Sequence, residues 1–357
     1  MASGVFGADG IAGSELIIVA GGRSAEHDVS LVSGAYLWNA AIEGGANVTG
    51  IGISRDGVWH HIASDQRPKT EDALAIDGPE VAIDSLAAAA QRGAVVVPAL
   101  HGPLGEDGTF QGACEVAGVA YTGAGVLASA LCMNKAVAKR FLAGAGIPQT
   151  PFVVIASSDS IDTVRERSQH LGFPLFVKPS SMGSSIGVSK VDDENALSTS
   201  VARAGAYDTC IVIEQAVVGR EIEIAVLGRR DTIVSRPGEI HVGAEFYDYH
   251  DKYEDDRATV SVPADLPVMV AQQVHDLALQ VTSVLGCREM ARCDMFVTAD
   301  GAVLLNEVNT IPGFTPISMY PKMLNDVGVT TVQILDRLVA DARARHARSL
   351  QRSTDHG

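Results

Sequence analysis

The chain has 357 residues, of which 46% are hydrophobic and 20% charged, a composition typical of a globular protein with room for two or three domains. Its formal net charge of −16 argues against a nucleic-acid or anionic-membrane surface, so any phosphate site must be a local positive pocket. The five cysteines lack C-x-x-C spacing, and we expect reduced thiols in a cytoplasmic protein with no signal peptide and no membrane span.

The first third of the chain alternates short apolar strands with loops and helices. Residues 16–20 form one such strand, and residues 94–100 form a second that ends at His101. This order predicts a parallel α/β sheet through about residue 132. Ligands usually collect beyond the carboxyl ends of such strands, where Glu26 and His101 lie. A dinucleotide-binding domain is the weaker alternative, because no GxGxxG motif follows the first strand.

A smaller α+β unit follows. Residues 134–145 predict a helix with Asn134 as its N-cap. After this helix we expect four strands and two helices, with the strands near 152–156, 175–178, 187–191 and 211–214, and the helices near 160–171 and 192–204.

The last third contains strands, a long polar loop and two helices. We expect strands near 221–227 and 232–235, a loop over about 237–263, and helices over 266–285 and about 330–345. A loop of this length in a compact enzyme is usually either a lid or disordered, and the aromatic residues of this one, which can pack, favour a lid. The expected domains are 1–132 with a flexible arm at 1–13, 133–215, 216–346 with the lid, and a flexible tail at 347–357.

Residues 291–316 carry the most informative pattern and predict a β-hairpin. Two runs of β-favouring residues flank an Asp-Gly pair at 300–301, which suits a two-residue turn. With that turn, Asp294 directly faces Glu307 across the ribbon. Two carboxylates at the roughly 5 Å of such a pair repel each other unless a positive charge lies between them.

The same register sets Arg292 opposite Asn309, and the alternation of side chains puts all four residues on one side. Asp, Glu and Asn oxygens suit a hard cation such as Mg²⁺, which is usually shared with substrate phosphates. A solvated hairpin face is the plain alternative. The nearby arginine and the Gly/Pro-rich loop at 310–316 favour the cation site.

A Gly/Ser-rich segment at 178–187 joins two expected strands and can present backbone N–H groups to phosphate oxygens. It is not a Walker A loop, because its lysine precedes the glycines. Lys178 and Lys135 supply cations there, although a structural hairpin and solvated lysines are the alternatives. Residues 212–221 can offer backbone groups and a carboxylate to an adenine edge, with Glu221 available for ribose hydroxyls; this signal is weak without context.

Six segments, taken in chain order, resemble the hallmark segments of the D-alanine–D-alanine ligase family of the ATP-grasp superfamily. They are residues 21–34, 101–112, 178–190, 219–228, 245–253 and 306–322, within roughly 15–340. The resemblance implies a three-domain ATP-grasp architecture, α/β and α+β, with an N-terminal parallel α/β (pre-ATP-grasp) domain. It also implies ATP-dependent joining of two D-alanine molecules through an acyl phosphate for peptidoglycan precursor synthesis, by a homodimer. A D-alanine–D-serine ligase is the alternative. A D-lactate variant is less favoured, because the chain keeps Tyr249, Lys252 and Tyr253.

The resemblance further implies roles for individual residues. Residues implied to bind ATP are Lys135, Lys178, Ser180, Ser185, Glu214, Val217, Glu221 and Lys252. Residues implied to bind two Mg²⁺ (or Mn²⁺) are Asp294, Glu307 and Asn309. The first D-alanine would contact Glu26 and His101, and the second would contact Ser318 and Met319. Ser184 and Tyr253 would close the lid, and Arg292 and the Gly313 N–H would stabilise the tetrahedral oxyanion.

Overall fold

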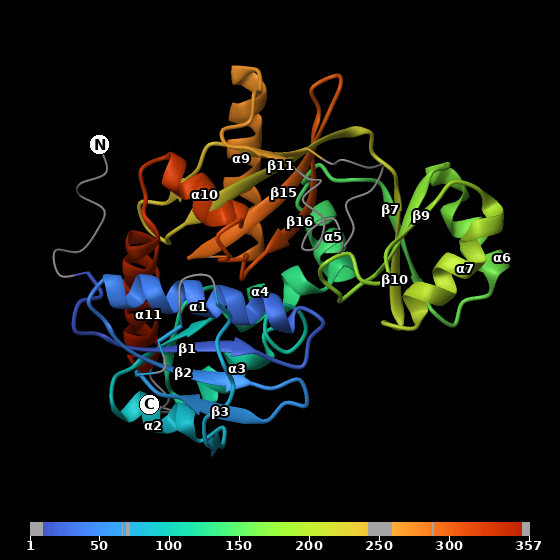
Figure 1. The fold of residues 1–357 in the computed structure, drawn as a ribbon. Helices are drawn as coiled ribbons and strands as arrows, with labels where there is room; N and C mark the ends of the chain where they lie inside the picture. The colour runs from blue at the N-terminus through green and yellow to red at the C-terminus, as the bar shows by residue number, and fades with distance from the viewer. Residues whose placement is uncertain (1–9, 66, 69–71, 242–258, 288, 352–357) are drawn as a thin grey trace, which may run out of the picture.

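The structure, a computed structural model, describes residues 10–65, 67–68, 72–241, 259–287 and 289–351. These residues form three sheets with helices packed around them (Figure 1). One sheet is mostly parallel and two are antiparallel, which agrees with the expected mixture of α/β and α+β units. Among the described residues, no helix is long and apolar enough to cross a membrane.

The N-terminal sheet has the strand order β4-β3-β2-β1-β5-β6. Its strands are β1 (Glu15–Gly21), β2 (Asn47–Ile53), β3 (Trp59–Ile62), β4 (Glu80–Val81), β5 (Val95–Pro98) and β6 (Ala120–Tyr121). Its helices are α1 (His27–Glu43), α2 (Ser85–Gln91), α3 (Thr109–Ala117) and α4 (Val126–Met133). The β1, β2, β5 and β6 strands pair in parallel, as expected from their short apolar runs. The β3 and β4 strands extend the sheet in an antiparallel sense and were not expected.

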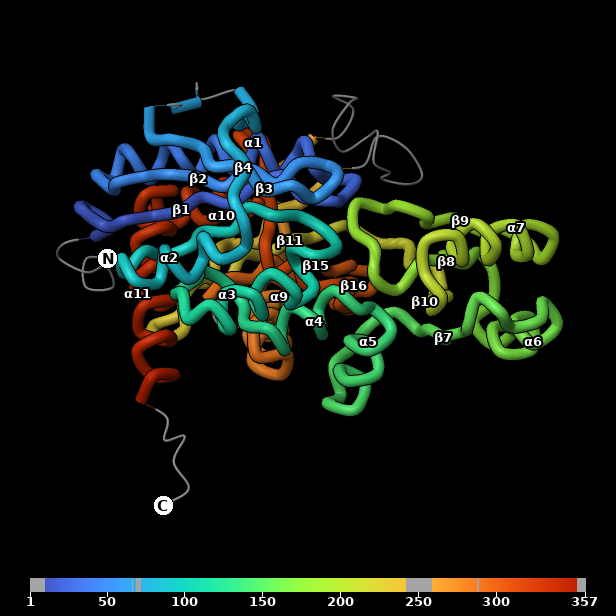
Figure 2. The backbone as a smooth tube through the Cα atoms, turned by 90° about the horizontal axis from the view of Figure 1, so that it is seen from below, coloured from blue at the N-terminus to red at the C-terminus, as the bar shows by residue number. Residues whose placement is uncertain are grey.

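The central sheet has the order β7-β10-β8-β9 and projects away from the other two (Figure 2). Its strands are β7 (Phe152–Ala156), β8 (Leu175–Pro179), β9 (Ser189–Val191) and β10 (Cys210–Gln215). Its helices are α5 (Lys135–Gly144), α6 (Ile161–Ser168), a 3₁₀ turn (Gln169–Leu171) and α7 (Glu194–Gly205). The Asn134 side chain accepts a hydrogen bond from the Val137 N–H, so the predicted cap of α5 is confirmed.

The C-terminal sheet has the order β14-β13-β11-β15-β16, with β12 paired to β11. Its strands are β11 (Gly219–Leu227), β12 (Ile233–Val234), β13 (Gly238–His241), β14 (Thr259–Ser261), β15 (Met290–Thr298) and β16 (Val303–Asn309). Its helices are α9 (Val268–Leu285), α10 (Met319–Asp326) and α11 (Thr331–Leu350). The expected loop at 237–263 therefore begins and ends in paired strands. The middle of that expected lid, 242–258, lies outside the described residues.

Helix α11 packs against α1, β5 and β6, so the last helix of the chain covers part of the N-terminal unit (Figure 1). It continues to Leu350, four residues into the tail expected at 347–357. The expected flexible arm also contains a packed residue. Ile11 is buried in the core shared by the N- and C-terminal units, and its N–H donates to the Asp336 carboxylate over 2.7 Å.

Candidate active site

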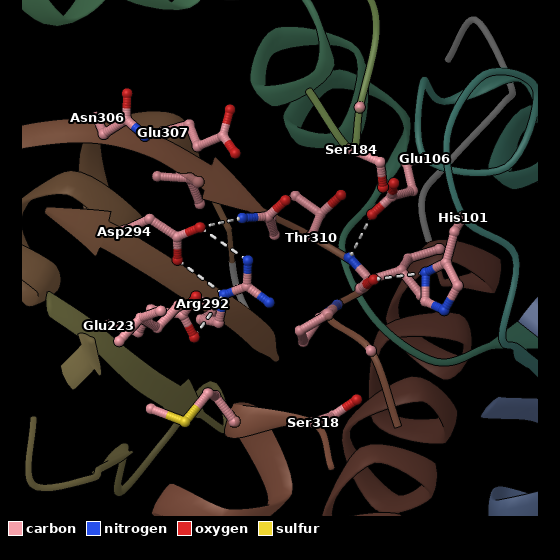
Figure 3. Close-up of a pocket in the computed structure, with 18 of the residues that line it drawn as sticks. His101, Glu106, Ser184, Glu223, Arg292, Asp294, Asn306, Glu307, Thr310 and Ser318 are labelled. Carbon is pink, nitrogen blue, oxygen red and sulfur yellow. Dashed lines mark hydrogen bonds and ion pairs between the residues drawn. The ribbon is translucent and has the colours of Figure 1, made fainter. Parts of the chain in front are cut away.

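A cavity of about 340 Å³ lies where the three units meet. It is lined by β15 and β16 of the C-terminal sheet, by loops that follow β5 and β16, and by the loop between β8 and β9 (Figure 3). Most of the residues singled out from the sequence line it, namely Glu26, His101, Lys135, Ser184, Glu221, Arg292, Asp294, Glu307, Asn309, Gly313, Ser318 and Met319. The fold thus brings together residues separated by almost 300 positions in the chain.

The β15–β16 hairpin has the predicted pairs but not the predicted turn. Asp294 pairs with Glu307 and Arg292 with Asn309. Beyond Asp294 the register shifts, because Met295 pairs with Leu305 and leaves Asn306 as the extra residue of a β-bulge. The turn is correspondingly one residue longer than a two-residue turn. The longer turn and the bulge cancel, so the register at the cavity is as expected.

Alternation along β15 then decides which side chains reach the cavity. Cys293, Met295 and Val297 are buried in the core against α9. The residues that alternate with them, Arg292, Asp294 and Phe296, turn to the opposite face and line the cavity. The apolar face of the hairpin therefore fixes the direction of its polar face.

A pair of carboxylates surrounds the Arg292 guanidinium. Its Nε and Nη2 atoms each donate to Asp294 over 2.7 Å, and Nε lies 3.2 Å from a Glu223 oxygen. The Asn309 amide donates to the same Asp294 carboxylate over 2.9 Å. Burial by itself disfavours the charged guanidinium, but the two carboxylates raise the pKa of Arg292 well above its usual value. Glu223 was not among the residues predicted from the sequence.

Cations also hold the carboxylates where the hairpin meets the central unit. The Lys135 ammonium lies 3.3 Å from Glu307 and donates to the Met182 carbonyl over 2.8 Å. The Lys178 ammonium lies 2.7 Å from Glu214, and the Lys139 ammonium lies 3.0 Å from the other Glu214 oxygen. Sequence reasoning missed Lys139, although it lies one helical turn after Lys135 on α5.

The β8–β9 loop closes the cavity against the N-terminal unit. The Ser184 hydroxyl donates to a Glu26 oxygen at the start of α1, and Ser184 adopts a left-handed φ of +48°. A Cβ atom on Gly183 would lie 2.6 Å from Glu26 Oε2, so glycine allows this close approach without a shift of Glu26 or the loop. Ser180 faces elsewhere. Its hydroxyl is fully buried, donates to the Asn134 side chain and accepts from the Ala136 N–H, which leaves it holding the loop to α5 rather than free for a phosphate.

Three side chains of the N-terminal unit hold the loop that follows β16. The His101 Nδ1 atom lies 3.1 Å from the Ile311 carbonyl, and its Nε2 atom lies 3.0 Å from the Ser33 hydroxyl. Ser33 also accepts from the Phe314 N–H over 3.2 Å. The donors and acceptors match for a neutral imidazole with its proton on Nδ1. Both ring nitrogens are therefore engaged, so His101 positions the loop in this geometry.

Glu106 completes the same set of contacts and was not singled out from the sequence. One oxygen accepts from the Gly102 N–H over 2.7 Å, and the other accepts from the Ile311 N–H over 3.3 Å. Burial, and then the nearby Glu26 charge, raise the pKa of Glu106 to about 8. Its position five residues after His101, in a loop at a strand end, is the signal that could have identified it.

The loop then leads to a close contact between Gly313 and Ser318. A Cβ atom on Gly313 would lie 2.8 Å from the Ser318 Oγ atom, so a larger residue would require the Ser318 side chain or the loop to shift. That Oγ atom accepts from the Thr315 N–H over 2.9 Å. Ser318 precedes α10, whose N-terminus begins at Met319 and faces the cavity. The exposed N–H groups of a helix start favour a carboxylate.

Several predicted residues lie away from the cavity lining. Lys178 and Glu214 lie behind it, and Val217 is half-buried in the connection between β10 and β11. Ser185 has a left-handed φ of +58° in the β8–β9 loop. Lys252 and Tyr253 lie outside the described residues. Within the described ranges, no three His, Cys, Asp or Glu side chains cluster as a metal site would; the expected set comprises two carboxylates and an amide.

Comparison with known proteins identifies the family. Residues 15–124 match the model of the D-ala D-ala ligase N-terminus, and residues 141–340 match that of the D-ala D-ala ligase C-terminus. The chain belongs to the D-alanine–D-alanine ligase family. D-alanine–D-alanine ligase A of Mesorhizobium japonicum is 44% identical over 93% of this chain and 98% of the relative. The ligase A of Salmonella typhimurium is 42% identical over 92% and 95%.

Solved structures confirm that the fold is that of this ATP-grasp family. The D-alanine–D-alanine ligase of Coxiella burnetii superposes with a TM-score of 0.80 at 30% identity, over 95% of this chain and 96% of that one. The VanG D-Ala:D-Ser ligase of Enterococcus faecalis superposes with a TM-score of 0.81 at 32% identity, over 92% and 99%. The predicted family and the predicted fold class are both confirmed.

Proposed function

We propose that this chain joins two D-alanine molecules into D-alanyl-D-alanine, with cleavage of ATP to ADP and phosphate, and so supplies a peptidoglycan precursor. The observation that carries the proposal is the hairpin register, which sets Asp294 opposite Glu307 and Arg292 opposite Asn309 on one wall of the cavity. The family membership and the names of the relatives support the same reaction.

ATP would lie between the central and C-terminal sheets. Lys135 and Lys178 would meet its phosphates beneath the β8–β9 loop, whose backbone N–H groups add donors. Glu214, the backbone at Val217 and Glu221 would face the adenine and ribose. Glu214 lies near the end of β10, Val217 in the connection to β11 and Glu221 near the start of β11, and Glu214 contacts Lys178.

Asp294, Glu307 and Asn309 would hold two Mg²⁺ (or Mn²⁺). Their donors are all oxygens of the kind that hard cations prefer, and both carboxylates are already balanced by a neighbouring cation, Arg292 or Lys135. When bound, the metal would neutralise charge on the transferring phosphoryl group.

The reaction would proceed in two steps. A carboxylate oxygen of the first D-alanine attacks the γ-phosphorus, the bond to ADP breaks, and an acyl phosphate forms. Glu26 holds the ammonium of that D-alanine through the carboxylate oxygen that has no hydrogen-bond partner among the described residues, while its other oxygen accepts from Ser184. The closed loop excludes water, which would otherwise hydrolyse the acyl phosphate.

In the second step the deprotonated amine of the second D-alanine attacks the acyl carbon, and phosphate leaves with the oxygen that ATP activated. Arg292 and the Gly313 N–H stabilise the tetrahedral oxyanion, a contribution of about 2.7–4 kcal/mol for one donor. Ser318 and the Met319 N–H hold the carboxylate of the second substrate at the start of α10. D-serine at this position is the alternative, since a structural relative carries that specificity in its name.

We further propose a cytoplasmic homodimer that binds neither nucleic acid nor membrane. The five cysteines are all free thiols, which suits a reducing compartment. The adjacent helices α3 and α4 expose Val116 and Leu127 at 92% and 72%, which suits a face covered by a second copy.

The test is ADP release with D-alanine, D-serine and D-lactate supplied singly and in competition, followed by product analysis. We expect ADP release that depends on D-alanine, with D-alanyl-D-alanine as the main product. ADP release that is independent of every amino acid would reject the ligase assignment, and a mixed D-alanyl-D-serine product would favour the alternative.

A further inference from the structure

Lys139 is a buried lysine that none of the expected roles includes. It lies on α5, and only 3% of its side chain is exposed. Its ammonium donates to the Thr150 hydroxyl over 2.9 Å, lies 3.0 Å from Glu214, and sits 5.3 Å from the centre of the Phe152 ring. A buried ammonium is costly unless it is paired, so a side chain that only fills space here would more favourably be apolar.

The partner of Lys139 is also the partner of a proposed phosphate ligand. Glu214 Oε1 faces Lys139, and Glu214 Oε2 faces Lys178 at 2.7 Å. The two lysines therefore share one carboxylate. Burial alone would raise the pKa of Glu214, but the two ammonium groups lower it to about 2, so the carboxylate is ionised.

The net charge of Lys139, Lys178 and Glu214 together determines whether they can attract a phosphate. Two ammonium groups and one carboxylate leave one net positive charge, whereas Lys178 and Glu214 alone would be neutral. Glu221 and Glu307 also act on Lys178 and favour its charged form. Removal of Lys139 would take one positive charge from this group, and a polyphosphate would gain less from approaching Lys178.

We propose that Lys139 is a positioning residue for nucleotide binding, which neutralises Glu214 from behind so that Lys178 presents a net positive charge to the ATP phosphates. This inference rests on the proposed nucleotide site. It predicts that Lys139 acts on the phosphates of the nucleotide and not on adenosine, although it touches neither.

The test compares the Kd of ADP with that of adenosine, each measured by calorimetric titration in the presence of Mg²⁺. Lys139→Met keeps the length of the side chain and removes its charge. We expect it to weaken ADP binding about tenfold or more, with adenosine binding changed far less. Lys139→Arg keeps the charge and should recover most of the loss. Thr150→Val removes only the hydrogen bond and is the matched control, expected to bind ADP nearly as the wild type does.

A charge-restoring double variant separates this role from a purely structural one. Lys139→Met with Glu214→Gln leaves Lys178 as a single positive charge, so the ratio of ADP to adenosine affinity should return toward the wild-type value. The ratio is used because Glu214 is itself proposed to face adenine. If Lys139→Met weakens ADP and adenosine equally, or if the double variant restores nothing, Lys139 has a packing role only.

The same experiment distinguishes failure of this inference from failure of the proposed function. Wild-type protein that binds no ADP would reject the nucleotide site itself. Wild-type protein that binds ADP, beside a Lys139→Met variant with unchanged ADP affinity, would reject only the role of Lys139. Should Lys139→Met fail to fold, the Lys139→Arg and Glu214→Gln variants still report whether the affinity ratio follows net charge.

Discussion

Three carboxylates at or behind the cavity, those of Glu214, Asp294 and Glu307, are held by cations, and the pairs differ in burial. Glu214 and its two lysines are almost fully enclosed, and Asp294 is held in a two-bond contact with Arg292. The Glu307 side chain is 30% exposed and its contact with Lys135 is the longest of the three, at 3.3 Å. The Glu307 pair is therefore the one that opens most readily when ligands enter.

Replacement of Glu307 by Gln should reduce turnover far more than stability. The amide keeps the shape of the side chain but removes the charge expected to hold Mg²⁺. Loss of even an indirect metal contact costs about 10–100-fold, so we expect at least that decrease in kcat. Asp300→Asn, in the turn of the same hairpin, is the control and should keep normal activity. Near-normal turnover in Glu307→Gln would refute the metal assignment.

Glu106 should make the stability of the protein depend on pH. Its folded pKa of about 8 exceeds the usual 4.5, so between these values the unfolded chain releases a proton that the folded chain keeps. Wild-type stability should therefore fall as pH rises from 4.5 to 8, by up to about 1.4 kcal/mol per pH unit, relative to a Glu106→Gln variant. Denaturant unfolding of both proteins over this range measures the difference, and parallel pH profiles would contradict it.

At the scale of elements, the hairpin and the β8–β9 loop bring charges together across strands and units. The bulge at Asn306 lets Glu307 face the cavity while Leu305 stays in the core. It also directs the Asn306 side chain toward Lys178, 3.4 Å away. In the loop, Gly183 lets Glu26 approach closely, because a Cβ atom there would lie 2.6 Å from its carboxylate.

Substitution of Gly183 by Ala should hold the loop away from Glu26. A methyl group there would lie 2.6 Å from a carboxylate oxygen, so Glu26 or the loop must shift, and we expect the Ser184 contact to weaken. We expect KM for D-alanine to rise about tenfold or more, with a smaller change in KM for ATP. Gly144→Ala, at the end of α5, is the matched control, because an added Cβ atom there would meet no atom of a neighbouring segment within 4 Å. Equal KM values in wild type and Gly183→Ala would argue against loop closure on Glu26.

At the scale of the molecule, α11 connects the N-terminal unit to the C-terminal sheet. Arg345 contacts the Glu289 carboxylate before β15 and the Gly123 and Tyr121 carbonyls of the N-terminal unit, and its guanidinium stacks 4.3 Å from the Tyr121 ring. Glu289 is almost fully buried, and burial raises its pKa to about 7 against the opposing effect of Arg345. This contact fixes the N-terminal unit against the C-terminal sheet.

Arg345 does not line the cavity, so its replacement should destabilise the folded protein without changing the cavity directly. Arg345→Met leaves Glu289 buried without its cation, for which a cost of about 3–5 kcal/mol is expected. Denaturant unfolding measures this loss. The double variant with Glu289→Gln should regain a large part of it, because no unpaired charge then remains. Equal stability of the single variant and the wild type would show that the contact contributes little.

The local pattern of the chain was sufficient for most elements and for the family. Apolar runs, an Asn cap and Gly/Pro boundaries predicted the central unit and the final helix within a few residues, since these signals depend on near neighbours. The pairing of Asp294 with Glu307 was also predictable, because residues close in sequence meet across a hairpin. The turn and the bulge of this hairpin were not predictable. A two-residue turn without a bulge and a three-residue turn with one both pair Asp294 with Glu307.

Only the tertiary structure revealed Ser33, Glu106, Glu223 and Lys139, which the sequence presented as ordinary helix, turn and strand residues. Each acquires its role from a partner on another element: Phe314, Ile311, Arg292 and Glu214 respectively. The sequence by itself determined which segments fold and which family they resemble. Which carboxylate faces which cation was decided by long-range packing, because charge pairing depends on distance and burial that no local pattern encodes.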